Sequence, residues 1–234
     1  MPQIKAILFD CDGTLVDSES SHYLAFKQVL AAMGYDFSVR EHSQFVGKSD
    51  LATADFLAKK CGIDASSLIL KKRARYLEFC QAGLPQIEPT VQFLKSLARD
   101  KARYGIKLGV CSAAPKSEVL FHVRHLGIES FLDVVLSGEN DLGAYSDPEG
   151  VNKPKPYIYL HAAELLKIAS SECVVIEDSP TGIAAGKSAG AWVVAIPNEH
   201  TKRHDLSAAH LQLDSFSGID VEQFLDSFVY TARD

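Results

Sequence analysis

The chain has 234 residues, of which 24 are basic and 30 are acidic, so its formal charge is −6. Hydrophobic residues make up 47% and charged residues 23%, which is typical of a globular protein with one large core or a core plus a smaller unit. An acidic chain without a block of Lys and Arg argues against broad nucleic-acid binding. No run of about 18 apolar residues predicts a membrane-spanning helix. We therefore expect neither nucleic acid nor membrane as a partner.

The N-terminal residues and the cysteines favour a reducing compartment. The apolar run 4–9 ends at Asp10 without a small-residue cleavage site, so we expect no signal peptide. The five cysteines are scattered and form no Cys-x-x-Cys pair, which argues against a disulfide scaffold and against a zinc site. We expect a cytoplasmic protein.

Short apolar runs rich in β-branched residues recur along the chain and predict strands that are buried on both faces. These runs are 4–9, 106–111, 134–136, 174–176 and 192–196. Helical stretches separate them, and one begins after Pro154 and Pro156, which suit a helix entrance. Alternating strands and helices predict an α/β fold with a doubly wound parallel sheet.

The alternation stops between Ser18 and about Leu84, where only helical patterns occur. The spacing predicts a first helix that ends at Gly34, a second that ends near Gly62 and a third over about 66–81. We therefore expect a small all-helical domain over residues 18–85. It is inserted into an α/β core domain formed by residues 1–17 and 86–234.

Polar residues follow three of the predicted strands, and ligands of an open parallel sheet bind outside the carboxyl ends of its strands. These residues are, in chain order, Asp10, Asp12, Ser112, Glu177 and Asp178; Ala113 follows Ser112, and Lys153 lies in a loop that precedes a helix. Each of them alone could be an ordinary turn or capping residue. Their conjunction at one edge of the sheet indicates a functional site.

The chemistry of this site follows from its residue types. Four carboxylates held close together repel one another unless a cation joins them, and Mg²⁺ is the cation that suits oxygen ligands. A cation with a lysine and a serine hydroxyl can bind a phosphate group. A neighbouring carboxylate can then attack phosphorus, and a second one can transfer protons. The residues predict Mg²⁺-dependent phosphoryl transfer.

These segments resemble the four signatures of the haloacid dehalogenase superfamily. Residues 9–18 are similar to the first signature, 110–112 to the second, 153–156 to the third and 176–183 to the fourth. The helical insert lies where the β-phosphoglucomutase and sugar-phosphatase branch has a helical cap. The resemblance implies a Rossmann-like core of this superfamily with an inserted cap domain.

The resemblance also implies roles for individual residues. Asp10 would be the nucleophile and Asp12 the general acid and base. Ser112 and Lys153 would hold the phosphoryl oxygens, with Ala113 in the same substrate-binding loop as Ser112. Because true dehalogenases lack the acid at the position of Asp12, we do not expect dehalogenation.

The metal ligands implied by the resemblance are four acidic residues. Asp10 would bind Mg²⁺ directly, Asp12 through its backbone oxygen, and Asp178 would complete the site. Glu177 would be either a ligand or a residue that supports one, and Asp178 is favoured as the direct ligand.

Substrate choice in this branch resides largely in the cap, where His22, Gly47 and Lys48 are candidates. His22 occupies the place of a cap-hinge histidine, although it could be only a polar residue at a helix start. Val46 and Asp50 stand where β-phosphoglucomutase has two cations. Lys48 could compensate in part, could form an imine as in phosphonate-cleaving relatives, or could be a solvated lysine.

We expect a monomeric, Mg²⁺-dependent phosphatase that acts on a small phosphorylated metabolite, a sugar phosphate. The alternatives are a phosphosugar mutase of the β-phosphoglucomutase type and a non-catalytic member that binds a phosphorylated ligand or a protein. The acidic loop 138–152 is longer than expected, and is either a surface insertion or a lip of the active site. We expect Trp192 in the core, and His200, His204 and His210 at the surface.

Overall fold

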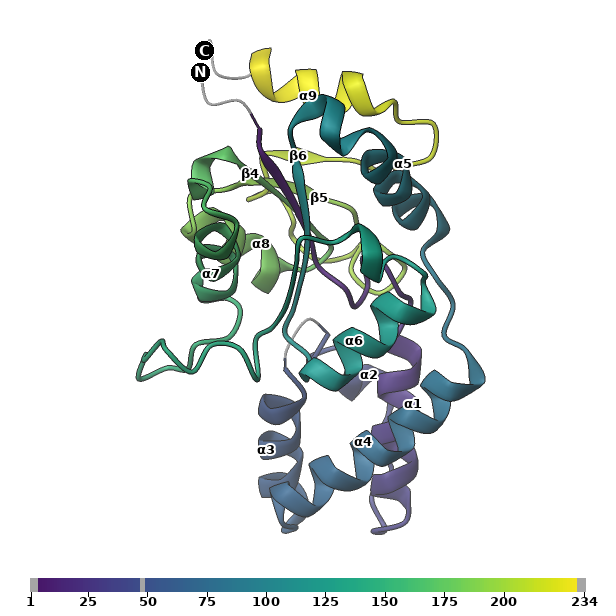
Figure 1. Ribbon diagram of the computed structural model, residues 1–234. Helices are drawn as coiled ribbons and strands as arrows, with labels where there is room; N and C mark the ends of the chain where they lie inside the picture. The colour runs from purple at the N-terminus through teal and green to yellow at the C-terminus, as the bar shows by residue number, and fades with distance from the viewer. Residues whose placement is uncertain (1–3, 47–48, 231–234) are drawn as a thin grey trace.

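The computed structural model describes residues 4–46 and 49–230 (Figure 1). Its six strands form one parallel sheet in the order β3-β2-β1-β4-β5-β6. They are β1 (Ala6–Phe9), β2 (Lys107–Ser112), β3 (Val134–Ser137), β4 (Cys173–Glu177), β5 (Trp192–Ala195) and β6 (Leu211–Gln212). The predicted α/β fold is confirmed. Strand β6 was not predicted, because two residues are too few to make a pattern.

Strand β1 lies in the middle of the sheet and is buried on both faces. Its residues alternate, so that Ile7 and Phe9 belong to one core while Ala6 and Leu8 belong to the other. Helices cover both faces, as a doubly wound sheet requires (Figure 1). The first core includes residues of α5 (Glu88–Tyr104), α6 (Lys116–His125) and α9 (Val221–Tyr230), and the second includes residues of α7 (Tyr157–Leu166) and α8 (Pro180–Ser188). The short 3₁₀ helices η1 (Glu129–Phe131) and η2 (Ser170–Glu172) precede β3 and β4.

Four further helices gather at one end of the sheet (Figure 1). They are α1 (Glu19–Ala31), α2 (Val39–His42), α3 (Asp50–Cys61) and α4 (Ala65–Ala82). The three longer ones match the predicted helices. Helix α2 was missed, although Ser38 and Glu41 form a capping box whose Ser-x-x-Glu spacing is visible in the sequence. These helices enclose an apolar cluster of their own, which includes Phe26, Phe37 and Leu68.

Two adjacent segments connect these helices to the sheet. The backbone N–H of Asp17 donates to the carbonyl of Pro85 at 2.8 Å, and that of Ile87 donates to Leu15 at 2.9 Å. Val16 forms an antiparallel bridge with Gln86. The chain therefore leaves and re-enters the sheet region at one place, just after Asp12.

The C-terminal part of the chain packs against α5 through aromatic rings. Phe216 stacks on Phe93 with ring centroids 4.2 Å apart, and Phe224 meets both rings edge-on. Trp192, expected in the core, begins β5 but is only partly buried.

Within the described residues, no helix combines the length and the apolar character that a membrane span requires.

We expect Phe216→Ala to lower the free energy of unfolding by about 3–4 kcal/mol, because it opens a cavity against Phe93 and Phe224. Urea denaturation measures the change. As a control, Leu165→Ala removes an apolar side chain that is 53% exposed, and should cost less than about 0.5 kcal/mol. Equal costs for the two variants would show that the aromatic stack does not anchor the C-terminal segment.

Candidate active site

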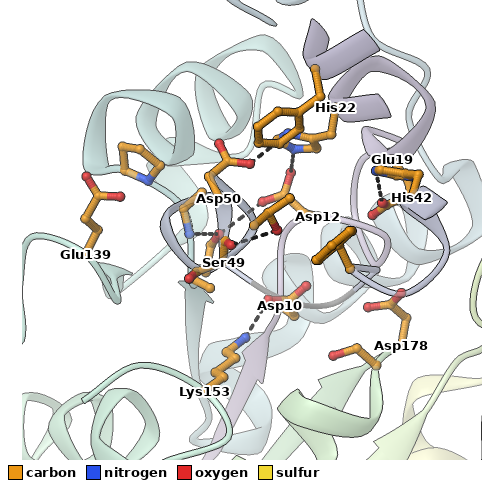
Figure 2. Close-up of a pocket in the computed structure, with 18 residues that line it drawn as sticks. Asp10, Asp12, Glu19, His22, His42, Ser49, Asp50, Glu139, Lys153 and Asp178 are labelled. Atoms are coloured by element: carbon orange, nitrogen blue, oxygen red, sulfur yellow. Dashed lines mark hydrogen bonds and ion pairs between the residues drawn. The ribbon is translucent and has the colours of Figure 1, made fainter. Parts of the chain in front are cut away.

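Asp10 lies at the end of β1 and shares a buried lysine with Glu177. The Nζ atom of Lys153 donates to Oδ1 of Asp10 at 2.6 Å and to Oε1 of Glu177 at 2.7 Å. It also donates to the backbone carbonyl of Cys111 at the end of β2, at 2.9 Å. One cation therefore joins three strand ends. Figure 2 shows its contact with Asp10.

Burial controls the ionisation of the carboxylates here. It raises the pKa of Asp10 to about 8, with Lys153 opposing the shift and Glu177 and Asp12 adding to it. Burial also raises the pKa of Asp178 well above its usual value, and the charges of Glu177 and Asp10 add to this shift. A single lysine thus leaves these carboxylates with an excess of negative charge that a further cation would relieve.

The donor set fits a divalent cation. Carboxylate oxygens of Asp10, Glu177 and Asp178 lie within 4.8 Å of one another, and they form a possible metal-binding group in the described part of the chain. Such hard oxygen donors are those that Mg²⁺ prefers. The residues present could hold this ion.

Glu177 is completely buried, and several hydrogen bonds fix its position. Oε1 accepts from the hydroxyl of Tyr159 at 2.8 Å as well as from Lys153, while Oε2 accepts from the hydroxyl of Ser179 at 3.1 Å. A Cβ atom on Gly182 would lie 1.8 Å from Oε1, so the carboxylate occupies space that only a glycine leaves open. Tyr159, in α7, was missed by the sequence analysis.

Asp178 is held by Asn198, which follows β5. The Nδ2 atom of Asn198 donates to Oδ2 of Asp178 at 2.8 Å and to the backbone carbonyl of Gly13 at 2.9 Å. Gly13 has a φ of +83°, and a Cβ atom there would lie 2.4 Å from Asp178. Asn198 was not predicted, although it follows a predicted strand at the same edge of the sheet as the other site residues.

Three side chains from two parts of the chain, the start of α1 and the end of β2, hold Asp12. The hydroxyl of Ser18 donates to Oδ1 at 2.7 Å, the hydroxyl of Ser112 donates to Oδ2 at 3.1 Å, and Nε2 of His22 lies 3.6 Å from Oδ1. Burial favours the neutral acid, but His22 and His122 outweigh it, with Ser18 assisting, and hold the pKa of Asp12 well below its usual value. Asp12 is therefore ionised in this arrangement. Ser18 ends the first signature but was given no role by the sequence analysis.

A buried lysine orients His22. Lys72 of α4 is completely buried, with its Nζ atom 2.6 Å from Nδ1 of His22 and an ion pair to Asp50. An ammonium group can only donate hydrogen bonds, so Nδ1 accepts and the ring proton lies on Nε2, toward Asp12. Tyr76 stacks on the imidazole at 4.0 Å. No local sequence signal marked Lys72.

The loop before Lys153 is attached to the end of β2. The Nδ2 atom of Asn152 donates to the carbonyl of Ala113 at 3.1 Å, and its Oδ1 accepts from the backbone N–H of Lys153 at 2.9 Å. A Cβ atom on Gly138 would lie 2.3 Å from Asn152. Asn152 therefore places Lys153 beside the Ser112 loop.

A pocket lies between these residues and the helices α1 to α3, with about 820 Å³ of space when its open mouth is counted. Most of the predicted site residues line it, namely Asp10, Asp12, His22, Ser112, Ala113, Lys153 and Asp178. Glu177 is not part of the lining. Gly47 and Lys48 fall outside the described residues. Loop 138–152 contributes Glu139 to the lining, so its first residues form a lip of the pocket.

The three histidines that were expected at the surface, His200, His204 and His210, do not belong to the acidic site. His200 and His204 are partly buried, and His210 is exposed. His200 lies 3.7 Å from Asp17, and Nδ1 of His210 accepts from the backbone of Val193 at 2.9 Å. The metal-binding group found among the described residues contains none of these three histidines.

Glu19 of α1 and His42 of α2 form a pair at the side of the pocket that these helices line. Nε2 of His42 lies 3.2 Å from Oε1 of Glu19, and both residues line the pocket. Burial lowers the pKa of His42 to about 4, and the nearby His22, His200 and Lys72 add to the shift. His42 is therefore a neutral imidazole at neutral pH.

We expect Asn198→Ala to weaken Mg²⁺ binding about 10- to 100-fold, because Asp178 loses the amide that orients it. Isothermal titration calorimetry with MgCl₂ measures this directly. Asn140→Ala, which alters an exposed amide, should bind Mg²⁺ like the wild type. Wild-type affinity in Asn198→Ala would contradict the role assigned to this amide.

The shifted pKa of His42 predicts an acid sensitivity. Between pH 6.5 and about 4 the unfolded chain protonates this residue and the folded chain does not, so stability falls as the pH is lowered through this range. His42→Asn should flatten that part of the curve when urea unfolding is followed from pH 7 to pH 4.5. His125→Asn, at an exposed position, should keep the wild-type slope. An unchanged slope in His42→Asn would refute the prediction.

Comparison with known proteins identifies the family. Residues 4–190 match the haloacid dehalogenase-like hydrolase family. The phosphorylated carbohydrates phosphatase of Thermotoga maritima is 29% identical over 193 residues, which are 80% of this chain and 82% of that protein. Protein CbbY of Cereibacter sphaeroides is 31% identical over 228 residues, 92% and 93% of the two chains.

The crystal structure of β-phosphoglucomutase from Clostridium difficile superposes with a TM-score of 0.77 at 26% identity, covering 98% of this chain and 100% of that one. These matches confirm the predicted superfamily and branch, and the expectation of an enzyme. The chain belongs to the haloacid dehalogenase-like hydrolase family.

Proposed function

We propose that this chain is a Mg²⁺-dependent phosphatase that hydrolyses a small phosphorylated carbohydrate through an aspartyl phosphate on Asp10. The observation that carries the proposal is the contact of 2.6 Å between Asp10 and the buried Lys153, at the base of a pocket that Asp12 also lines. The name of the Thermotoga maritima relative supports the substrate class.

Residues 18–85 would act as a cap domain on a core formed by residues 1–17 and 86–234. The paired segments at Asp17 and Pro85 would serve as the hinge, because few backbone contacts join the two parts there. An ion pair between Arg73 of α4 and Glu139 joins the helices to the pocket lip. Closure of the cap over a bound substrate would exclude bulk water.

Asp10, the backbone oxygen of Asp12 and Asp178 would hold Mg²⁺. Glu177 would support this site rather than bind the ion directly, since both of its oxygens accept hydrogen bonds from protein groups. When bound, the ion would supply positive charge that stabilises the phosphoryl oxygens. Lys153 and Ser112 would contact the same oxygens from the strand ends.

In the first step, a carboxylate oxygen of Asp10 attacks phosphorus, and the bond between phosphorus and the ester oxygen breaks. Asp12 gives its proton to that leaving oxygen. The arriving phosphate dianion adds negative charge beside Asp12, which favours uptake of this proton before the step. In the second step, Asp12 takes a proton from water and the water oxygen attacks phosphorus. The bond between phosphorus and the Asp10 oxygen breaks, which releases inorganic phosphate and restores the Asp10 carboxylate.

A phosphosugar mutase is the second candidate, and the likeness to the Clostridium difficile β-phosphoglucomutase favours it. A mutase has to hold a bisphosphate intermediate. Among the described residues that line the pocket, Lys153 is the only Lys or Arg, and Asp50 carries the wrong charge for a second phosphate. The phosphatase is therefore our first candidate.

We expect Mg²⁺-dependent phosphate release from one or a few sugar monophosphates. Asp10→Asn should reduce kcat by about a thousandfold or more, because an amide oxygen is a poor nucleophile. A colorimetric phosphate assay measures both. Asp17→Asn, whose side chain is 51% exposed in the same signature, should retain activity.

A coupled assay for conversion of β-glucose 1-phosphate to glucose 6-phosphate separates the two candidates. Isomerisation with little free phosphate would reverse their ranking. Absence of phosphate release from every ester, including p-nitrophenyl phosphate, would contradict the phosphatase.

A further inference from the structure

Three carboxylates line the pocket beyond the proposed phosphate site. Glu19 comes from the first turn of α1, Asp50 from the first turn of α3 and Glu139 from the loop after β3. Figure 2 shows all three around the pocket, above Lys153 in this view. The leaving alcohol of an ester whose phosphate binds at Lys153 would extend into this part of the pocket.

The partners of these carboxylates do not belong to the pocket lining. Asp50 is paired with the fully buried Lys72, and Glu139 is paired with Arg73, but neither cation lines the pocket. Glu19 is paired with His42, whose burial keeps it uncharged at neutral pH. A substrate therefore meets acidic oxygens, with the cations of α4 lying behind them.

This arrangement distinguishes leaving groups by their charge and hydrogen-bonding capacity. Carboxylate oxygens accept hydrogen bonds, so they match the hydroxyl groups of a polyol and the ammonium group of an amino sugar. A second phosphate or a carboxylate offers only acceptors when ionised. Such a group would also bring a negative charge close to the partly buried carboxylates of Glu19, Asp50 and Glu139. The repulsion between like charges makes its binding costly.

We propose that Glu19, Asp50 and Glu139 make the pocket selective for phosphomonoesters of uncharged or amine-bearing alcohols, and against esters that carry a second anionic group. The proposal rests on the proposed phosphatase function, because it concerns the alcohol that leaves from phosphate. It assigns to these residues a part in substrate specificity.

Matched esters that differ by one anionic group test the proposal. Initial rates of phosphate release give kcat/KM for fructose 6-phosphate against fructose 1,6-bisphosphate, and for ribulose 5-phosphate against ribulose 1,5-bisphosphate. We expect each monophosphate to exceed its bisphosphate by about tenfold or more. Glucosamine 6-phosphate should match or exceed glucose 6-phosphate.

Glu19→Gln tests the role of these carboxylates directly, because it keeps the size of the side chain and an oxygen for His42 but removes the charge. We expect the ratio of monophosphate to bisphosphate kcat/KM to fall about three- to tenfold, and Glu139→Gln to act in the same direction from a different element. Asp55→Asn removes a charge from an exposed position of α3 and should leave the ratio unchanged. Thermal unfolding of each variant confirms that it is folded.

The outcomes separate the two proposals. If phosphate is released but a bisphosphate is preferred, or if neither glutamine variant alters the ratio, the specificity assignment fails while the phosphatase stands. If no ester, including p-nitrophenyl phosphate, releases phosphate, the proposed function fails and the specificity assignment falls with it.

Discussion

The ammonium group of Lys153, held between Asp10 and Glu177, is the interaction on which the site depends. All three side chains are nearly or completely buried, so their charges are removed from water at a cost of several kcal/mol per ion. The attraction between them offsets this cost only if the geometry is maintained. The ends of β1, β2 and β4 and the loop of Lys153 after β3 are therefore fixed relative to one another around one cation.

The surrounding residues maintain that geometry by hydrogen bonds and by close approach of the backbone. Tyr159 and Ser179 fix Glu177, Asn198 fixes Asp178, and Asn152 fixes the loop of Lys153. Three glycines, Gly13, Gly138 and Gly182, stand where a Cβ atom would overlap one of these side chains. Rigid strands and these small residues together bring like charges closer than they would otherwise lie.

The helices over the site contribute a second buried cation, Lys72, which is matched by Asp50 and His22. Because His22 also reaches Asp12, the position of these helices and that of the Asp12 carboxylate are physically linked. The same helices place Glu19 and Asp50 in the pocket, and Asp50 also belongs to the buried ion pair with Lys72.

The sequence alone was sufficient for the parallel α/β core, the helical insert and the residues at the strand ends. These depend on local patterns, namely buried β-branched runs, helical spacing and polar residues where a strand stops. Asp10, Asp12 and Ser112 could be named in advance because each lies where a predicted strand stops, and Lys153 because it lies in a loop before a predicted helix. The four-residue helix α2 and the two-residue strand β6 are too short for such a pattern to be decisive.

Only the tertiary structure decided which residues from distant segments meet the site. Lys72 lies in a helix of the insert and Tyr159 in a helix of the core, and nothing in their local sequence marks them. Asn198 follows a predicted strand, but only the folded chain shows that it contacts Asp178. Likewise, the sequence showed that Asp50 is acidic where a mutase has a cation. Its pairing with the buried Lys72 became visible only through the packing of α3 against α4. The strands are determined by short-range periodicity, whereas such contacts arise only when the folded chain brings together residues far apart in sequence.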